Sequence, residues 1–224
     1  VDTRTEVLLM RLDLTTGKEK EILRLKNAYI YPLAARKDAL IYHRLDALPQ
    51  DEMLNMNFEK LDAMLDQAFD LDLDKAVYEN FCRELEQGKH LLYLTDNAGE
   101  IGFDRIFAEE IAGKYPHLDI TFCVRGGPAA NDALRCDAET VGIPFRVIDN
   151  GNLVSGTELS MLSREAKEAM DTADVIISKG MANTETLYGS GYPIYYAFLI
   201  KCARFVQFFE KPLMTPMLVA EKNG

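Results

Sequence analysis

Short apolar runs recur along the C-terminal part of the chain, and each ends in polar residues. The five runs are His90–Thr95 (HLLYLT), Leu118–Val124 (LDITFCV), Phe145–Ile148 (FRVI), Asp174–Ser178 (DVIIS) and Tyr195–Ile200 (YYAFLI). Strands that are apolar without interruption belong to sheets that are covered on both faces. Because helical patterns separate the runs, the sequence predicts a mostly parallel sheet with helices on both of its faces.

Three helices are predicted between the runs. Their markers are the apolar face Phe103, Ile106, Phe107 and Ile111 for the first, Pro128 at the start of the second, and the apolar face Leu159, Leu162, Ala166 and Ala169 for the third. The two faces follow the 3.6-residue period of a helix, and proline is favoured in a first helical turn.

The first ninety residues are less regular. Residues 57–69 and 74–87 have helical periodicity, and Gly88 is a natural stop for the second helix. Residues 1–45 fit either a helix pair or a hairpin that turns at Thr16-Gly17. The predicted division is a largely helical N-terminal portion, residues 1–89, and an α/β core, residues 90–224.

Composition restricts the class of protein. Of 224 residues, 48% are hydrophobic and 27% are charged, which is typical of a globular chain. The formal charge of −11 argues against a nucleic-acid partner, which requires a basic face, and suits a site that collects divalent cations. We expect no membrane span and no signal peptide, because no apolar run is long enough. Four cysteines without a C-x-x-C pair indicate buried free thiols and a cytoplasmic location.

Chemically active side chains follow three of the predicted strands. The segments are Thr95–Glu100 (TDNAGE), Arg125–Pro128 (RGGP) with Asn131-Asp132 beyond it, and Ser178–Asn183 (SKGMAN). In an open parallel sheet, ligands bind outside the carboxyl ends of the strands. Turns, helix caps and solvated charges explain each segment taken alone. The three together favour one functional site.

The residue types at these ends suit a metal ion and a phosphoryl group. Asp96, Asn97 and Asp132 supply hard oxygen ligands for an ion such as Mg²⁺ or Mn²⁺. Arg125 and Lys179 supply the positive charge that a phosphoryl group needs. Repulsion between Asp96 and Asp132 also leads us to expect that Asp132→Ala stabilises the metal-free protein.

The strings YLTDNAGEIGFD, CVRGGPAANDAL and IISKGMANTETL resemble the three signature segments of the damage-control phosphatase family, and most closely its stand-alone prokaryotic branch. The resemblance covers about residues 90–205. It implies a three-layer α/β/α sandwich with a helical N-terminal portion. It also implies hydrolysis of phosphate monoesters of small metabolites, such as damaged or surplus sugar phosphates, with one divalent ion: Mn²⁺, Mg²⁺, Co²⁺ or Ni²⁺.

The resemblance assigns roles by position. Its metal ligands fall on Asp96, Asn97 and Asp132, its catalytic residues on Asp96, Lys179 and Glu100, and its phosphate-binding or site-lining residues on Arg125, Lys179, Gly180 and Asn183. The attacking group is either a metal-bound water or Asp96. The chain lacks the N-terminal C-x-x-C and the G-N-x-x-D-like segment of the prokaryotic branch, so residues 1–56 lie outside the resemblance.

Other functions remain open at this point. A phosphatase of the haloacid-dehalogenase type requires a second Asp two residues after the first, where this chain has Ala98. An S-adenosylmethionine-dependent carboxyl methyltransferase would need an adenosine-binding loop, and no glycine-rich loop of that kind is found. A non-catalytic, metal-dependent phosphometabolite-binding protein would need the same pocket as the phosphatase, so only turnover separates the two.

Overall fold

The computed structural model describes residues 6–13, 19–26, 34–35, 39–45 and 73–221. The chain divides into two compact units, residues 1–71 and 72–224. The sequence assigned residues 74–87 to the N-terminal portion that it ended at residue 89. In the structure these residues form α3 (Lys75–Gln87), which belongs to the second unit together with residues 90–224.

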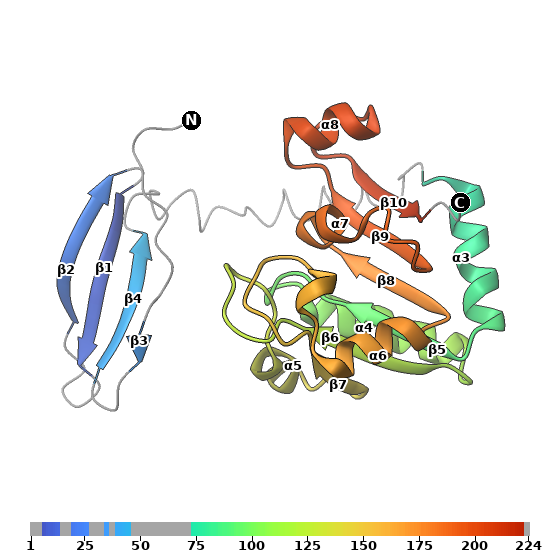
Figure 1. Cartoon of the computed structure of the whole chain (residues 1–224), viewed down its shortest axis with the longest axis horizontal. Coiled ribbons are helices and arrows are strands. Elements are labelled where there is room, and N and C mark those ends of the chain that lie inside the picture. The colour runs from blue at the N-terminus through green and yellow to red at the C-terminus, as the bar shows by residue number, and fades with distance from the viewer. Residues whose placement is uncertain (1–5, 14–18, 27–33, 36–38, 46–72, 222–224) are drawn as a thin grey trace. The chain divides into compact units, whose positions relative to one another are not determined.

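The N-terminal unit contains a four-stranded antiparallel sheet. Its strands are β1 (Glu6–Asp13), β2 (Glu19–Lys26), β3 (Ala34–Ala35) and β4 (Ala39–Leu45), in the order β2-β1-β4-β3 (Figure 1).

Strands β1 and β2 form a hairpin, the second of the two alternatives for residues 1–45. The expected helical character is therefore wrong for residues 6–13, 19–26, 34–35 and 39–45, which form strands. Strand β1 is central in this sheet and pairs with β2 on one side and β4 on the other. The helix predicted over 57–69 lies outside the described residues.

The second unit is built on a six-stranded sheet. Its strands are β5 (His90–Leu94), β6 (Asp119–Val124), β7 (Arg146–Asp149), β8 (Val175–Lys179), β9 (Ile194–Leu199) and β10 (Pro216–Ala220). The order is β10-β9-β8-β5-β6-β7, and only β10 is antiparallel to its neighbour. All five strands predicted from apolar runs are confirmed. The antiparallel edge strand β10 was not predicted.

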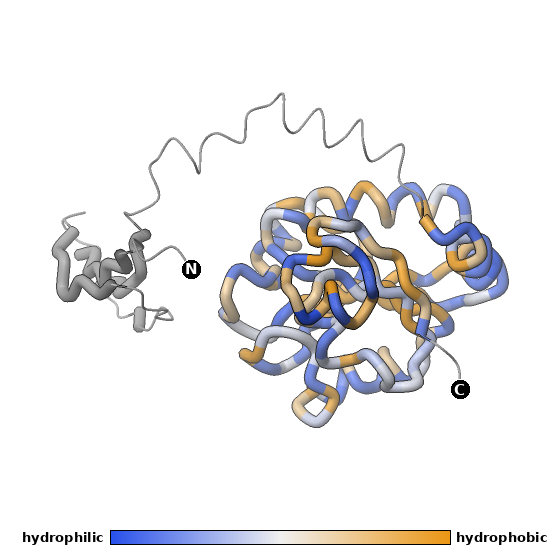
Figure 2. The backbone as a smooth tube through the Cα atoms, turned by 90° about the horizontal axis from the view of Figure 1, so that it is seen from above, coloured by the Kyte–Doolittle hydropathy of each residue, from blue (hydrophilic) through white to orange (hydrophobic). Residues whose placement is uncertain are grey.

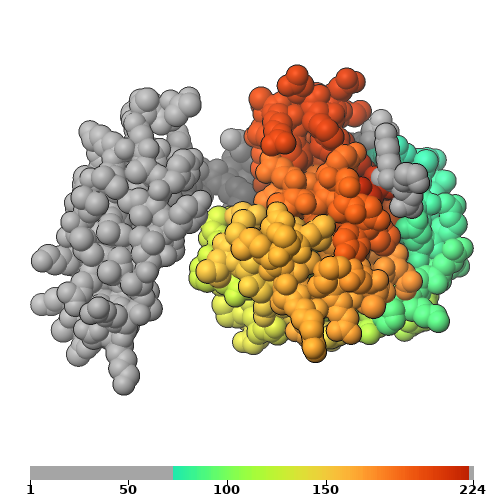
Figure 3. Space-filling view, viewed as in Figure 1, coloured from blue at the N-terminus to red at the C-terminus, as the bar shows by residue number. Residues whose placement is uncertain are grey.

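Helices cover both faces of this sheet. The first layer contains α3, α4 (Ile101–Lys114) and α5 (Arg135–Val141), and the second contains α6 (Arg164–Thr172), α7 (Met181–Leu187) and α8 (Ala203–Phe209). Each layer packs its own set of buried residues on the strands. In Figure 3 the yellow to red segments, which include α6 and α7, cover the face turned toward the viewer. The predicted three-layer α/β/α sandwich is confirmed.

Helix α3 shows how these layers are held. It buries Phe81 and Leu85 against the sheet and turns charged residues to solvent, so hydrophobic and hydrophilic residues alternate along its turns (Figure 2). Asp74 caps its first turn by accepting bonds from the N–H groups of Ala76 and Val77. Gly88 ends the helix as predicted.

All three helices predicted between the strands are present, but each differs in part from the sequence pattern. In α4 the buried face is Ile101, Asp104, Ala108 and Ile111, whereas Phe103, Ile106 and Phe107 are exposed. A carboxylate on the buried face hid the true period. Pro128 lies in a loop, and α5 begins only at Arg135, because residues 125–134 are bonded to the neighbouring loops instead. The third helix is α6, capped by Ser163; it contains Ala166 and Ala169 of the predicted face, whereas Leu159 and Leu162 lie before it, in and after a short 3-10 turn, Leu159–Met161.

Two sequence expectations about the whole chain can also be compared with the described residues. None of their helices has the length and apolar character needed to cross a bilayer. The four cysteines are free, but only Cys123 is buried and Cys136 is exposed, so the expectation of buried thiols holds for one of them.

The order of the strands creates one distinctive place on the sheet. The chain runs from β5 outward to β6 and β7, then returns to the other side of β5 for β8 and continues to β9. The winding therefore reverses between β5 and β8. Loops leaving the carboxyl ends of strands diverge at such a switch point, and ligands of open α/β sheets bind there.

Candidate functional site

The loops that follow β5 and β6 are tied together. Asn97 and Asp132 form an isolated antiparallel bridge. On either side, Ala98 N–H donates to the Asn131 carbonyl at 2.9 Å and Ala133 N–H donates to the Asp96 carbonyl at 2.8 Å. These backbone bonds bring together Asp96, Asn97 and Asp132, the three residues predicted to hold a metal ion.

The loop after β8 meets the same place through Gly180. A Cβ atom at this position would overlap the Asp96 carboxylate, and the φ of +84° disfavours any side chain. The Gly180 N–H donates to the Ala197 carbonyl at 3.0 Å, so it is already bonded within the sheet. Gly180, predicted as a phosphate-binding or site-lining residue, therefore contributes space beside Asp96, while its N–H is bonded within the sheet.

Negative charge is concentrated around Asp96. Burial raises its pKa to about 6, and the nearby Glu100 and Asp132 carboxylates add to the effect. The Asn97 side-chain amide donates to Asp96 Oδ2 and to Glu100 Oε1, both at 2.8 Å. A positive ion here would offset the repulsion among these carboxylates.

Lys179 faces this group from the end of β8. Its Nζ lies 2.7 Å from Asp104 Oδ1 and 3.3 Å from Glu100 Oε2. Burial lowers the pKa of Lys179, but the two carboxylates outweigh burial and raise it. Burial acts to raise the pKa of Glu100, but bonds from Asn97 and Lys179 outweigh it and lower that pKa. Lys179 is therefore a cation at neutral pH, and 21% of its side-chain surface remains exposed.

Arg125 lies behind the site. Its residue exposure is 5%, its Nε donates to Asp132 Oδ2 at 2.8 Å, and its guanidinium also donates to the Gly156 carbonyl. The predicted phosphate-binding cation is thus committed to holding Asp132 and the loop after β7. Asp132 has a buried partner of opposite charge, so its removal would leave that charge uncompensated. The expected gain in stability from Asp132→Ala is not supported.

Asn183 is also a supporting residue. It is 1% exposed, and its amide donates to the carbonyls of Thr95 at 2.9 Å and Lys179 at 2.8 Å, while its oxygen accepts from Thr157 Oγ1 at 2.8 Å. These bonds fasten the carboxyl ends of β5 and β8 to each other. Asn183 thereby fixes the distance between the Asp96 and Lys179 loops and does not face a ligand.

Three residues near the site were missed by the sequence reasoning. Lys201 follows β9, close enough to Asp96 and Glu100 for its charge to favour their ionised forms. Asn150 follows β7, and its Oδ1 accepts from Gly126 N–H at 2.9 Å. Both are polar residues placed directly after predicted strands, the same signal that marked the other ends. Asp104 carried no such signal, because it lies inside a helix.

The donor set fits a divalent cation in its chemistry. Within the described ranges, no group of three or more His, Cys, Asp and Glu side chains is placed to hold a metal ion. The candidate set instead consists of two carboxylates and one amide oxygen. The mutual repulsion at Asp96 and the oxygen character of the donors match a hard ion such as Mg²⁺ or Mn²⁺.

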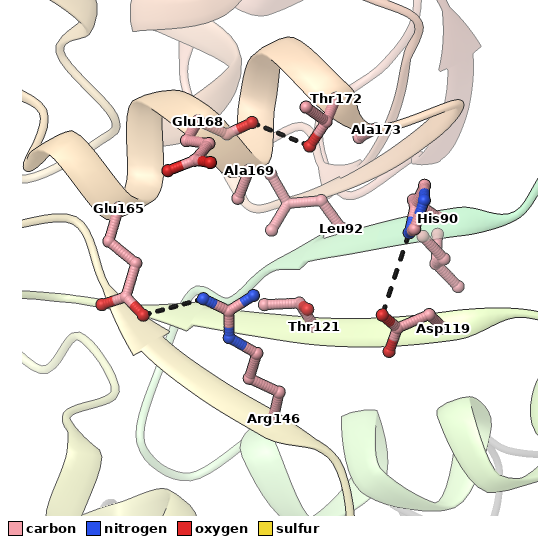
Figure 4. A pocket seen from close by; sticks show the side chains of 11 residues that line it. His90, Leu92, Asp119, Thr121, Arg146, Glu165, Glu168, Ala169, Thr172 and Ala173 are labelled. Atoms are coloured by element: carbon pink, nitrogen blue, oxygen red, sulfur yellow. Dashed lines mark hydrogen bonds and ion pairs between the residues drawn. The ribbon is translucent and has the colours of Figure 1, made fainter.

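A cavity of about 190 Å³ lies at the opposite edge of the sheet, beside the amino ends of β5 and β6 (Figure 4). Besides Glu168, its ionisable groups form two pairs: Arg146 with Glu165 at 2.9 Å, and His90 with Asp119 at 3.8 Å. All four side chains are more than half exposed. We place the candidate site at the switch point because its charged groups converge from three strand ends and include the buried side chains of Arg125 and Asp132.

Comparisons with known proteins identify the family of this chain. A family model described as the damage-control phosphatase ARMT1-like domain matches residues 44–215. A protein named damage-control phosphatase from Pyrococcus horikoshii is 36% identical over 131 residues, which are 58% of this chain and 44% of that protein. One from Archaeoglobus fulgidus is 40% identical over 124 residues, 54% of this chain and 42% of that protein. The chain therefore spans less than half the length of these relatives.

A solved structure extends the comparison to three dimensions. The crystal structure of a DUF89 family protein from Pyrococcus horikoshii has a TM-score of 0.67 and 30% sequence identity, and the match covers 73% of this chain and 58% of that one. The matched part includes more than half of this chain, as does the region of the family model. The chain belongs to the damage-control phosphatase family with the ARMT1-like domain.

Proposed function

We propose that the chain carries a metal-dependent phosphatase site that hydrolyses phosphate monoesters of small metabolites, such as sugar phosphates. The observation that carries the proposal is the meeting of Asp96, Glu100 and Asp132 with the Lys179 ammonium at the switch point of the sheet. Family membership and two relatives named damage-control phosphatase support it.

Asp96, Asn97 and Asp132 would hold one divalent ion, Mn²⁺, Mg²⁺, Co²⁺ or Ni²⁺. When bound, such an ion neutralises phosphate charge and polarises the phosphoryl group. Arg125 orients the Asp132 carboxylate through its 2.8 Å bond. Gly180 leaves the Asp96 carboxylate open on the side of the β8 loop.

Lys179 and Lys201 would bind the phosphoryl oxygens. Phosphoryl transfer spreads negative charge over the equatorial oxygens, so preorganised cations lower the barrier. Lys179 is held in place by two carboxylates before the substrate arrives. Lys201 is exposed just after β9, so its flexible side chain can reach the phosphoryl groups of substrates of different size.

Glu100 would orient the attacking group. A general base works best when its pKa lies near the working pH, and the pKa of Glu100 is lowered by Asn97 and Lys179 despite burial. A carboxylate that stays ionised accepts a hydrogen bond from a water molecule and holds it for attack. We therefore assign positioning to Glu100 in preference to proton abstraction.

The test is release of inorganic phosphate from p-nitrophenyl phosphate and a panel of sugar phosphates, with each of the four ions and with EDTA. Release that depends on an added ion supports the proposal. Phosphate binding without turnover of any ester would indicate a binding protein instead. Consumption of S-adenosylmethionine with methyl ester formation would indicate the methyltransferase.

A further inference from the structure

Asp104 is a carboxylate in the interior of the protein. It lies in the first turn of α4, on the face that packs on the sheet together with Ile101 and Ala108, and it is 2% exposed. Ionisable side chains are almost never fully buried unless they are paired. The buried Asp104 carboxylate therefore requires a partner that bonds to it or offsets its charge.

The two oxygens of Asp104 have different surroundings. Oδ1 accepts from Lys179 Nζ at 2.7 Å and from the Tyr93 hydroxyl at 2.8 Å. Oδ2 is buried and has no hydrogen-bond partner within residues 73–221. A buried acceptor without a partner destabilises a fold. An apolar residue would serve the packing of α4 better, so packing alone does not account for Asp104.

Tyr93 makes Asp104 a rigid acceptor. Its ring stacks on Phe122 with centroids 4.7 Å apart at 7°, and its edge meets Phe107 at 6.5 Å. Burial, followed by the charge of Asp104, raises the pKa of Tyr93, so the hydroxyl stays a donor. The Tyr93 side chain, packed between aromatic rings, thus fixes the position of Asp104 Oδ1 from the side of the sheet.

Lys179 is held between Asp104, in the first turn of α4, and Glu100, the residue that precedes this helix. Asp104 and Glu100 are four residues apart, and residues at this spacing lie on one helix face. A lysine side chain has four flexible bonds, and the two carboxylates restrict where its ammonium can lie. The pair holds the Nζ atom beside the Glu100 carboxylate, which the Asn97 amide links to Asp96.

We propose that Asp104, fixed by Tyr93, is a positioning residue that holds the Lys179 ammonium for phosphate binding without touching the substrate itself. The inference rests on the proposed function, because it assumes that Lys179 contacts the phosphoryl group. It adds that the catalytic value of Lys179 depends on a buried helical carboxylate and on an aromatic hydroxyl behind it.

The kinetic test compares Asp104→Asn, Lys179→Met and the double variant on p-nitrophenyl phosphate with saturating Mn²⁺. We expect kcat to fall at least about tenfold in Asp104→Asn, because misplacing a catalytic group reduces the rate steeply. In the Lys179→Met background the same change should have no further effect on kcat, because Asp104 acts only through Lys179. Losses that multiply in the double variant would overturn the inference.

Two variants bracket this result. Tyr93→Phe keeps the ring and removes only the hydroxyl, so we expect a smaller fall in kcat in the same direction. It also decides the matter if Asp104→Asn does not fold. Asp119→Asn is the matched control, the same change at an exposed position on β6. Mn²⁺ affinity, measured by calorimetry, should remain that of the parent in Asp104→Asn, Tyr93→Phe and Asp119→Asn.

A readout independent of turnover separates this inference from the proposed function. The Nζ signal of Lys179 in nitrogen-15 NMR spectra, assigned by its absence in Lys179→Met, should shift or broaden in Asp104→Asn and Tyr93→Phe. If it does so while the parent hydrolyses no phosphate ester, the proposed function fails and the positioning stands. A signal unchanged in both variants overturns the positioning, whatever the activity.

Discussion

At the scale of single residues, Lys179 is the most direct probe of phosphate recognition. Lys179→Met keeps most of the aliphatic stem and removes the ammonium. We expect kcat on p-nitrophenyl phosphate to fall at least about a hundredfold, the usual loss when one preorganised transition-state donor is removed. Mn²⁺ affinity should survive, because Lys179 lies outside the Asp96, Asn97 and Asp132 set.

Lys114→Met is the control for Lys179→Met, since Lys114 is exposed at the far end of α4. A loss confined to KM would mean that Lys179 binds only the ground state of the substrate. If kcat and KM of Lys179→Met equal those of the parent, Lys179 has no role in the site.

Asp132 tests the buried ion pair. Its side chain is 7% exposed and that of Arg125 is 3% exposed. Breaking such a pair by removing one partner leaves a buried charge, so Asp132→Ala should lower the free energy of unfolding by about 3–5 kcal/mol. Asp132→Asn, which can still accept from Arg125 Nε, should lose less. Urea unfolding without metal, followed by circular dichroism, measures both. Equal stability of Asp132→Ala and the parent would contradict the pair.

Gly180 tests the space beside Asp96. Gly180→Ala adds a Cβ that overlaps the Asp96 carboxylate at a φ of +84°. We expect a loss of Mn²⁺ affinity of about 10–100-fold, the range for changes that displace a metal ligand indirectly, together with lower stability. Gly113→Ala is the control, because its Cβ would have no neighbour within 4 Å and α4 tolerates alanine. Parent-like calorimetry for Gly180→Ala would contradict the role of this glycine.

At the scale of elements, the sequence predicted what repeats along the chain and missed what depends on a distant partner. The five parallel strands were legible because burial on both faces requires unbroken apolar runs. The sequence also predicted the helix α4, but it did not predict which of its residues are buried. Asp104 is tolerated in the interior because Lys179 pairs with it. Lys179 lies 75 residues away in the sequence, so the local periodicity of α4 gives no sign of the pair.

The candidate site shows the same limit. The rule about strand ends located Asp96, Asn97, Asp132, Glu100 and Lys179, and the structure brings their loops together. The inward direction of Arg125 and Asn183 was not predictable. It depends on Gly156 and Thr157, in a loop whose path over the strand ends is set by tertiary packing.

Asp174 shows how one carboxylate joins two strands. It precedes β8 and accepts from the N–H groups of Lys89 at 2.7 Å and His90 at 2.9 Å, at the start of β5. These backbone bonds lower its pKa. We expect Asp174→Asn to reduce the free energy of unfolding at pH 7 by about 1 kcal/mol, a small value because the carboxylate is exposed.

The pH dependence of this effect has a definite sign. A carboxylate whose pKa is lower in the folded state stabilises the fold above its unfolded pKa, and the contribution disappears as pH falls through the folded pKa. The difference between parent and Asp174→Asn should therefore shrink from pH 6 to pH 3. Glu86→Gln, an exposed neutralisation on α3, is the matched control. A difference that grows toward low pH would contradict the assignment.

At the scale of the whole molecule, metal binding should appear as resistance to heat. A ligand that binds only the folded state at a hundred times its Kd stabilises it by about 2.7 kcal/mol. We therefore expect at least one of the four ions to raise the temperature of unfolding, as measured by scanning calorimetry. Asp132→Asn should lose the shift. The absence of a shift with every ion would contradict the metal site.

The switch point also has a consequence for how the protein becomes active. Lys179 and Glu100 meet across 79 residues of chain, and the strands β6 and β7 are laid down between them. Closing a loop of that length carries an entropy cost, and contacts so distant in sequence form late in folding. A nascent chain that has not yet emerged beyond residue 179 has the Asp96 loop but no cation opposite it. Under the proposed function, a chain that ends before β8 would lack the Lys179 ammonium that binds the phosphoryl group, so we expect it to leave phosphate esters unhydrolysed.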